Sequence, residues 1–152
     1  MPTVVSKTPQ DTTRLLQELY ERTGGGNWNY TSIAHCLKES KQQSYIGEKW
    51  NFTTNAEGEY LFDPCSKARH FIGLNCTNES IINGMALPCG ELSGTIPELL
   101  GQLMGLQILG LNVNQLSGTI PEWLGQLTGL QVLGLGENQL SGTIPSSISS
   151  YA

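Results

Sequence analysis

Apolar residues in the second half of the chain recur at spacings that predict short strands. Leu109 and Leu111 are separated by one glycine, which predicts a strand that buries both leucines on one face. The stretch 116–120 alternates in the same way, with hydroxyl side chains between apolar or small positions, and it predicts a second strand. The pattern therefore predicts two short strands in each unit of the chain.

This pattern recurs with a fixed period. Residues 92–115 and 116–139 differ at five of their 24 positions, and a third, partial copy begins at Leu140. A proline follows the second strand and ends it because proline has no N–H to donate, and Leu124 and Leu127 are spaced for a short helical turn. A period of this size is typical of a solenoid, in which each coil buries its apolar face against its neighbours.

An asparagine recurs at the turn after the first strand of each coil, as Asn114 and Asn138. A buried asparagine there can satisfy backbone groups of its own coil and of the adjacent coil, so we expect an asparagine ladder. A degenerate first coil begins near Ile82, where Gly90 replaces the ladder asparagine and Cys89 precedes it. We interpret this coil as a transition between the regular repeats and the residues before them.

The N-terminal part of the chain predicts a helix followed by a cap. Residues 8–11 (Thr-Pro-Gln-Asp) are typical of a helix start, with a threonine N-cap and a proline and an acid in the first turn. Apolar residues within 15–20 form a stripe at helical spacing, and three glycines at 24–26 end the helix. We expect Trp28 and Trp50 to pack in the core that covers the end of the solenoid.

Charge is distributed unevenly along the chain, whose formal net charge is −5. All eight Lys and Arg residues lie between Lys7 and Arg69, and the residues after Arg69 include five Glu and no basic residue. A surface without cations does not collect phosphates, so we expect neither nucleic acid nor an anionic membrane as a partner. No apolar run approaches the ~20 residues that span a membrane.

Four cysteines, all before the regular repeats, indicate an oxidising compartment. No two of these cysteines form a C-x-x-C pair, which argues against a zinc site, and their even number fits two disulfides. Three pairings are compatible with four cysteines, and buried free thiols are the alternative. Four N-x-S/T sequons also predict secretion and N-glycosylation of the cap; they begin at Asn29, Asn51, Asn75 and Asn78.

The L-S-G-T-I-P block, which occurs three times at a spacing of 24, resembles the plant-type leucine-rich repeat LxxLxxLxLxxNxLxGxIPxxLxxLxx. The residues from Leu15 to Asn29, Trp50, and the segments 63–65 and 73–76 resemble the N-terminal capping domain of secreted and receptor-type leucine-rich repeat proteins. The resemblance implies the disulfides Cys65–Cys76 and Cys36–Cys89. Residues 31–49 are interpreted as an insertion relative to that family.

The resemblance implies an α/β solenoid, a short right-handed stack with a mainly helical and loop N-terminal cap. A parallel β-sheet is expected on its concave side and short 3-10 or helical turns on its convex side. We expect a disulfide-stapled capping domain over residues 1–81 and repeats over residues 82–152. The repeats divide into about three coils of 24 residues, at 82–105, 106–129 and 130–152.

No constellation of residues indicates catalysis. His35 and His70 are the only histidines, and no glycine pattern of a nucleophile elbow is present. Glu57, Glu59 and Asp63 are closely spaced carboxylates, which we interpret as a solvated loop. We therefore expect no enzyme activity, no cofactor and no metal site.

Recognition of a protein is the function that we expect, because curved repeat stacks offer extended concave surfaces. Three of the five differences between the two repeats fall at outward positions of the first strand or its end. This distribution fits either ligand tuning or drift after duplication. The candidate binding residues are Ile108, Asn112, Val113, Val132, Gly136 and Glu137.

Hydroxyl side chains form a second regular surface. If the second strands pair, rungs about 4.8 Å apart would present straight columns that could bind ice or a polysaccharide. Alternatively, these residues serve the fold. The columns are Ser93, Ser117 and Ser141, and Thr95, Thr119 and Thr143.

The third coil ends with a serine-rich segment in which Ile148 and Tyr151 take the positions of Leu124 and Leu127. A longer array, self-association through this end, or a polar cap formed by the serines would each account for it. We expect an extracellular recognition module of receptor, adhesion or inhibitor type, either secreted or the ectodomain of a larger membrane protein. A self-assembling structural protein is the alternative, and ice or polysaccharide binding is the third hypothesis.

Overall fold

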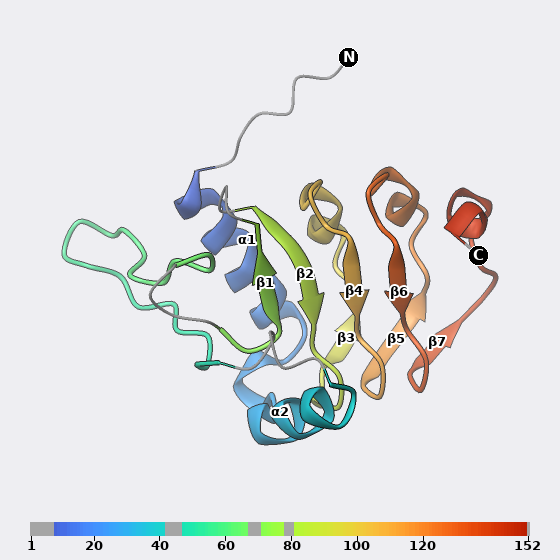
Figure 1. The fold of residues 1–152 in the computed structure, drawn as a ribbon, viewed down its shortest axis with the longest axis horizontal. Helices are drawn as coiled ribbons and strands as arrows, with labels where there is room; N and C mark the ends of the chain where they lie inside the picture. The colour runs from blue at the N-terminus through green and yellow to red at the C-terminus, as the bar shows by residue number, and fades with distance from the viewer. Residues whose placement is uncertain (1–7, 42–46, 67–70, 78–80, 152) are drawn as a thin grey trace, which may run out of the picture.

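A computed structural model describes residues 8–41, 47–66, 71–77 and 81–151 (Figure 1). Two α-helices precede a stack of coils that contain short strands and 3-10 turns. The helices are α1 (Pro9–Arg22) and α2 (Tyr30–Glu39), and the 3-10 helices are η1 (Gly25–Asn27), η3 (Glu98–Gln102), η4 (Glu122–Gln126) and η5 (Ser146–Tyr151). The strands are β1 (Leu74–Cys76), β2 (Ile82–Ala86), β3 (Ser93–Thr95), β4 (Ile108–Gly110), β5 (Gln115–Thr119), β6 (Val132–Gly134) and β7 (Gln139–Ser141).

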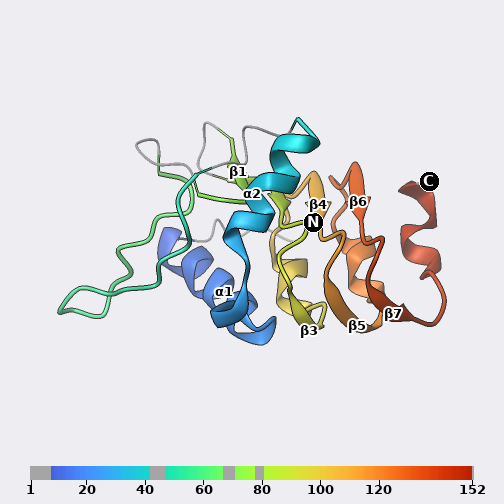
Figure 2. The ribbon, with the colours of Figure 1, turned by 90° about the horizontal axis from the view of Figure 1, so that it is seen from below.

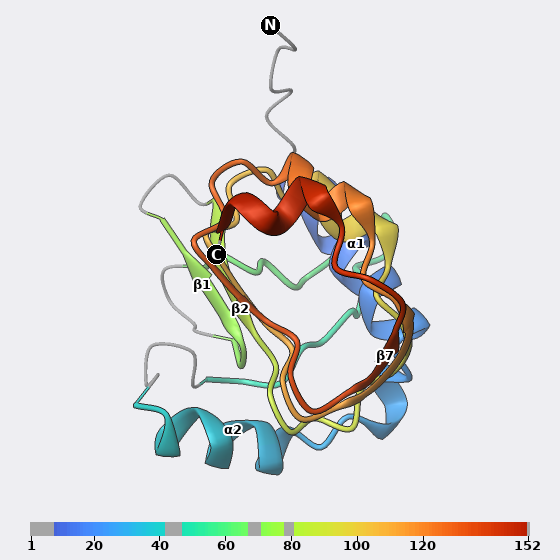
Figure 3. The ribbon, with the colours of Figure 1, turned by 90° about the vertical axis from the view of Figure 1, so that its right-hand side faces the viewer.

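The strands form two sheets on different sides of the coils. The main sheet has the order β1-β2-β4-β6, and the second sheet has the order β3-β5-β7. Seen along the stack, the coils superpose, with the main sheet on the left, the 3-10 turns at the top and the second sheet on the right (Figure 3). Leu109, Leu116 and Leu124, one from each side, are fully buried between them. The predicted solenoid of strands and short 3-10 turns is confirmed.

One strand of the main sheet runs against the others. β1 pairs with β2 in the antiparallel sense, with Leu74 opposite Met85, whereas β2, β4 and β6 are parallel. Only the short segment 77–81 joins β1 to β2, and a connection of this length allows an antiparallel pair but not a parallel one. The parallel sheet predicted for the repeats is confirmed in β2, β4 and β6, and β1 is an additional strand from the region predicted as the cap.

Helix α1 begins as the sequence predicts and ends against the stack. The Thr8 side chain accepts a hydrogen bond from the Asp11 N–H, and the Asp11 carboxylate accepts one from the Thr8 N–H, which completes a capping box. After the last residue, Arg22, the Thr23 carbonyl accepts a hydrogen bond from the Ser93 N–H of β3 at 3.1 Å. The end of α1 therefore covers the first edge of the second sheet (Figure 2).

Helix α2 lies within the segment interpreted as an insertion, and the sequence analysis overlooked it. Asn29 caps the helix by accepting a hydrogen bond from the Ser32 N–H at 2.9 Å. Ile33 and Leu37, one helical turn apart, are fully buried. These two residues are too few to give a clear helical stripe in the sequence, but they anchor α2 in the core.

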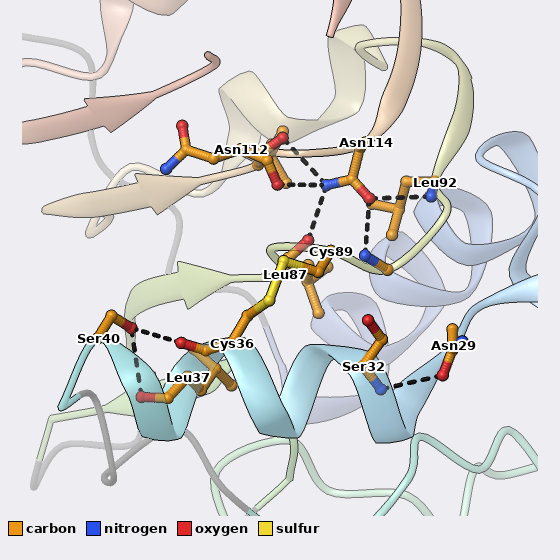
Figure 4. The surroundings of a disulfide bond; sticks show 12 residues. Asn29, Ser32, Cys36, Leu37, Ser40, Leu87, Cys89, Leu92, Asn112 and Asn114 are labelled. Carbon is orange, nitrogen blue, oxygen red and sulfur yellow. Dashed lines mark hydrogen bonds between the residues drawn. A yellow bond between two sulfur atoms is a disulfide. The ribbon is translucent and has the colours of Figure 1, made fainter. Parts of the chain in front are cut away.

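Two disulfides fasten the N-terminal region, by which we mean residues 8–77. Cys36 on α2 is joined to Cys89 in the first coil (Figure 4). Cys65 is joined to Cys76 on β1. These are the pairs that the family resemblance implies. Because Cys89 directly precedes Gly90, the first disulfide attaches α2 at the start of the asparagine ladder.

Aromatic rings fill the core of the N-terminal region. Trp28 and Trp50 are each 6% exposed, and their rings meet edge to face with centroids 5.1 Å apart. Both indole N–H groups donate to backbone carbonyls, Trp28 to Thr23 and Trp50 to Ile72. The two tryptophans are therefore core residues, as predicted. The other rings in contact are Tyr20, Tyr30, Phe52, Phe62 and Phe71.

The asparagine ladder is present in the stack (Figure 4). The Asn114 amide bonds five backbone groups; it accepts from the N–H groups of Gly90 and Leu92 and donates to the carbonyls of Leu87, Leu111 and Asn112. Asn138 repeats the arrangement one coil later, but it is only half-buried. Each ladder asparagine therefore ties its own coil to the preceding one.

Candidate recognition surface

The outward positions of the main sheet form rows across the stack. Leu109 is fully buried, so its neighbours in β4, Ile108 and Gly110, face outward. The register places Ile108 beside Val132 in one row and Gly110 beside Gly134 in the next. Val132 is 51% exposed. The surface thus combines an exposed apolar row with a flat row that has no side chains.

The first coil contributes two positions to these rows that the sequence analysis did not include. Gly84 lies beside Ile108, and Ala86 lies beside Gly110. The signal was the buried residue between them, Met85, which precedes Leu109 by 24 positions. We define the main-sheet face as Gly84, Ala86, Ile108, Gly110, Asn112, Val113, Val132, Gly134, Gly136 and Glu137.

The next coil fixes the side chain of Asn112. Its Oδ1 accepts a hydrogen bond from the Gly136 N–H at 3.1 Å. A Cβ atom at Gly134 would lie 2.6 Å from Asn112 Nδ2, so a glycine is needed where the asparagine crosses. Asn112 and Gly136 occupy the same position in successive repeats. Because the later repeat has a glycine there, the Asn112 side chain can lie over the next coil.

The residue before each ladder position has a left-handed backbone. The φ angles are 58° at Val113 and 54° at Glu137, and Cys89 in the first coil has 58°. A β-branched residue rarely adopts this conformation, which costs on the order of 1–2 kcal/mol. Val113 is also 41% exposed. Strained residues often cluster at functional sites, so Val113 is a strong candidate for ligand contact.

The charge of the main-sheet face is acidic. The exposed Glu137 lies at its edge, and the chain has no Lys or Arg after Arg69. A negative surface without nearby cations attracts basic ligands and disfavours acidic ones. Charge therefore favours a ligand that presents a basic group near Glu137.

The second sheet does not present the straight hydroxyl columns that the sequence predicts. Its strands pair with a register two residues short of the repeat, so Thr95 lies opposite Ser117, and Thr119 lies opposite Ser141. The reason lies in Gly118, which has a φ of 81°; a Cβ atom there would lie 3.1 Å from the Thr95 methyl. Threonine of one coil packs over glycine of the next.

The serine hydroxyls of the second sheet bond the backbone of the preceding coil. Ser117 donates to the Gly94 carbonyl and Ser141 donates to the Gly118 carbonyl, each at 3.3 Å. These hydroxyls stabilise the stack. Of the other predicted column residues, Ser93 is half-buried, and Thr95, Thr119 and Thr143 are exposed.

The sequons differ in how accessible their asparagines are. Asn29 and Asn51 are exposed, and the Oδ1 atom of each accepts a hydrogen bond from the local backbone. The Nδ2 atom of Asn29 makes one long hydrogen bond, to Glu91 at 3.3 Å. Asn75 is half-buried in β1, and its Nδ2 donates to Asn83 at 2.9 Å. Asn78 lies outside the described residues. Glycosylation stays a prediction, and the geometry favours Asn29 and Asn51.

The carboxylates and histidines singled out in the sequence do not converge in the described part of the chain. Glu59 accepts a hydrogen bond from Asn55, and Asp63 accepts one from the Cys65 N–H. His35 is exposed on α2, and His70 lies outside the described residues. Among those residues, no group of three or more His, Cys, Asp or Glu is placed to hold a metal ion.

A helix that could cross a membrane is also missing from the described residues, since none is both long and apolar enough.

Comparison with known proteins identifies the repeats. Residues 105–127 and 129–151 each match the family described as Leucine Rich Repeat. The BIR2 ectodomain from Arabidopsis thaliana is 28% identical, with a TM-score of 0.58 and coverage of 93% of this chain and 62% of that one. The PEPR1–AtPEP1 structure is 23% identical, with a TM-score of 0.57 and coverage of 91% and 19%, a likeness of fold alone.

This chain therefore spans less than two thirds of the BIR2 ectodomain and about a fifth of PEPR1. None of the curated proteins matches it.

Proposed function

We propose that this chain, a plant-type leucine-rich repeat protein with two disulfides, is an extracellular module for non-covalent recognition of a protein or peptide. The likeness to the BIR2 ectodomain supports this assignment. In our proposal residues 1–81 form a capping domain and residues 82–152 carry the recognition surface. The module acts by binding, without enzymatic chemistry.

The observation that carries the proposal is the apolar row beside the flat row on the main-sheet face. Val132, half exposed, continues the row of Ile108, while Gly110 and Gly134 beside it have no side chains of their own and the Asn112 side chain lies over Gly134. An extended segment can lie along such a flat strip and place alternate side chains against the apolar row. The strained, exposed Val113 borders the same strip.

The chemistry of the ligand follows from the charge of the face. Glu137 offers a carboxylate at the edge, and the stack has no cation to bind an acidic ligand. We therefore propose an extended peptide segment with a basic side chain next to small apolar residues. The two disulfides support an oxidising, extracellular setting, and Asn29 and Asn51 are the proposed glycan sites.

A selection of short random peptides against the disulfide-bonded, secreted protein tests the proposal. We expect enriched peptides to be basic, and to lose at least tenfold in affinity against Val132→Arg and against Glu137→Lys. Thr143→Lys is the matched control, because it places the same charge at an exposed residue beyond the end of β7, away from the proposed strip. Selected peptides that bind all four proteins equally, or acidic peptides, would contradict the proposal.

A further inference from the structure

A hollow of about 350 Å³ lies away from the main sheet, where α1 packs beside the 3-10 turns η3 and η4. Figure 3 shows α1 next to this layer of turns, on the side of the coils opposite β1 and β2. The volume is at the lower end of the ~300–1,000 Å³ typical of small-ligand sites. The hollow involves none of the residues of the main-sheet face.

One wall of the hollow is Trp123, at a position where the preceding repeat has a leucine. Its counterpart Leu99 also borders the hollow but is only 8% exposed, whereas Trp123 is half-buried. A Cβ atom at Gly101 would lie 3.1 Å from the Trp123 ring, so this glycine lets the ring pack against the preceding coil. The chain's other two tryptophans, Trp28 and Trp50, are core residues. Trp123 packs against the core but leaves part of its surface to the hollow.

The remaining walls supply hydrogen-bonding groups of both kinds. Glu98 and Gln126 are exposed at the turns, and Glu18 and Arg22 project from α1. Arg22 and Glu18 form an ion pair at 2.6 Å, which neutralises one of the two carboxylates. The hollow therefore offers acceptors, amide donors and a guanidinium around one indole, with a formal charge of about −1.

We propose that this hollow binds a neutral oligosaccharide. Sugar rings present apolar C–H faces that pack on an indole, and hydroxyl groups that both donate and accept hydrogen bonds. The ring of carboxylate, carboxamide and guanidinium groups around Trp123 matches that pattern. An apolar ligand would leave these polar groups without partners, at a cost for each one that loses water.

Charge disfavours an acidic ligand. An acidic sugar would meet Glu98 with only the already paired Arg22 to offset it. A neutral sugar avoids this repulsion. Glu98 would attract a cationic ligand, so trilysine is the competitor against which the neutral sugars are measured.

Calorimetric titration of the intact, disulfide-bonded protein with cellohexaose and with chitohexaose tests the inference. Intrinsic tryptophan fluorescence, followed in the same titrations, reports on the indole itself. The key variant is Trp123→Leu, because leucine is the residue that the preceding repeat carries at this position and should preserve the coil. Glu98→Gln keeps the size of the side chain and removes only its charge. Thr143→Lys is the control, because Thr143 is exposed and does not line the hollow.

We expect at least one of the two neutral hexasaccharides to bind the wild-type protein with a change in tryptophan fluorescence. Trp123→Leu should lower the affinity at least tenfold, Glu98→Gln by a few fold, and Thr143→Lys should leave it unchanged. The inference is overturned if neither hexasaccharide binds at millimolar concentration, if Trp123→Leu binds as well as the wild type, or if an oligogalacturonide or trilysine binds more tightly than both neutral sugars.

Discussion

The N-terminal region buries aromatic rings among its apolar side chains, whereas the repeat stack (residues 82–151) buries aliphatic ones, and the two regions hold them in different ways. In the N-terminal region each contact occurs once, as in the edge-to-face pair Trp28–Trp50 or the disulfide Cys65–Cys76. In the stack the same contact recurs from coil to coil, as with Asn114 and Asn138. A substitution in the stack can therefore be compared with the same substitution at the equivalent position of the next coil, whereas a substitution in the N-terminal region has no such counterpart.

The link between the two regions should give the largest effect. Cys36–Cys89 closes a sequence separation of 53 residues, against 11 for Cys65–Cys76. Loop-closure entropy predicts that replacing both cysteines of the long link by serine lowers the free energy of unfolding by about 4 kcal/mol. The matched Cys65→Ser, Cys76→Ser protein should lose about 3 kcal/mol.

Urea unfolding of the three non-reduced proteins, followed by circular dichroism, measures the difference. A larger loss for the Cys65–Cys76 pair would show that native contacts, rather than loop length, govern the link between the two regions.

The ladder should show how position within the stack changes the effect of one substitution. Asn114→Ala removes the partner of three buried backbone groups, the N–H groups of Gly90 and Leu92 and the Leu87 carbonyl, and should cost about 3 kcal/mol. The Leu111 carbonyl keeps its hydrogen bond from Asn138. Asn138→Ala removes equivalent bonds where water can replace them, because Asn138 is half-buried, and should cost about 1 kcal/mol. Urea midpoints of the two variants test this order, and equal losses would contradict it.

At the left-handed position before the ladder asparagine, a substitution should raise the free energy of unfolding instead of lowering it. Asn tolerates positive φ better than a β-branched residue, so Val113→Asn should stabilise the stack by about 1 kcal/mol. Glu137→Asn at the same position of the next coil should gain less, about 0.5 kcal/mol, because Glu is unbranched. Thermal unfolding of both variants checks the prediction, and a destabilised Val113→Asn would mean that the valine makes contacts that outweigh its strain.

Tyr30 in the N-terminal region predicts a loss of stability at alkaline pH. Its hydroxyl is buried without a well-formed hydrogen-bond partner in the described part of the chain. This burial, with a smaller effect from Tyr20, raises the pKa of Tyr30 well above its ordinary value. The nearby Trp50 backbone offsets part of the rise. The unfolded chain ionises this tyrosine near pH 10, so stability present below that pH is lost as the pH rises beyond it.

Tyr30→Phe should therefore flatten the alkaline loss of stability and add about 0.5 kcal/mol at neutral pH, because an unpaired buried hydroxyl is removed. Urea midpoints of wild type and variant between neutral pH and pH ~11 test the sign. Identical alkaline slopes for the two proteins would assign the loss to other groups.

The regular part of the fold could be predicted because its contacts are local in the repeat. The strand at Leu109, the turn at Leu124 and the ladder at Asn114 follow from alternation, spacing and side-chain chemistry within one period. Of the candidate site, the exposed positions Val113 and Val132 could be named in the same way. Their neighbours Gly84 and Ala86 follow the same period, but both are buried, which the period alone does not show.

The sequence by itself determined the coil: its period, its buried leucines, its ladder and the start of α1, since these depend on residues close in the chain or one period apart. Only the tertiary structure decided how the coils and the N-terminal region meet. The two-residue offset of the second sheet depends on Thr95 packing over Gly118, and the hollow at Trp123 depends on where α1 docks. Such contacts between distant segments leave no periodic signal in the chain, because packing rather than local propensity selects them.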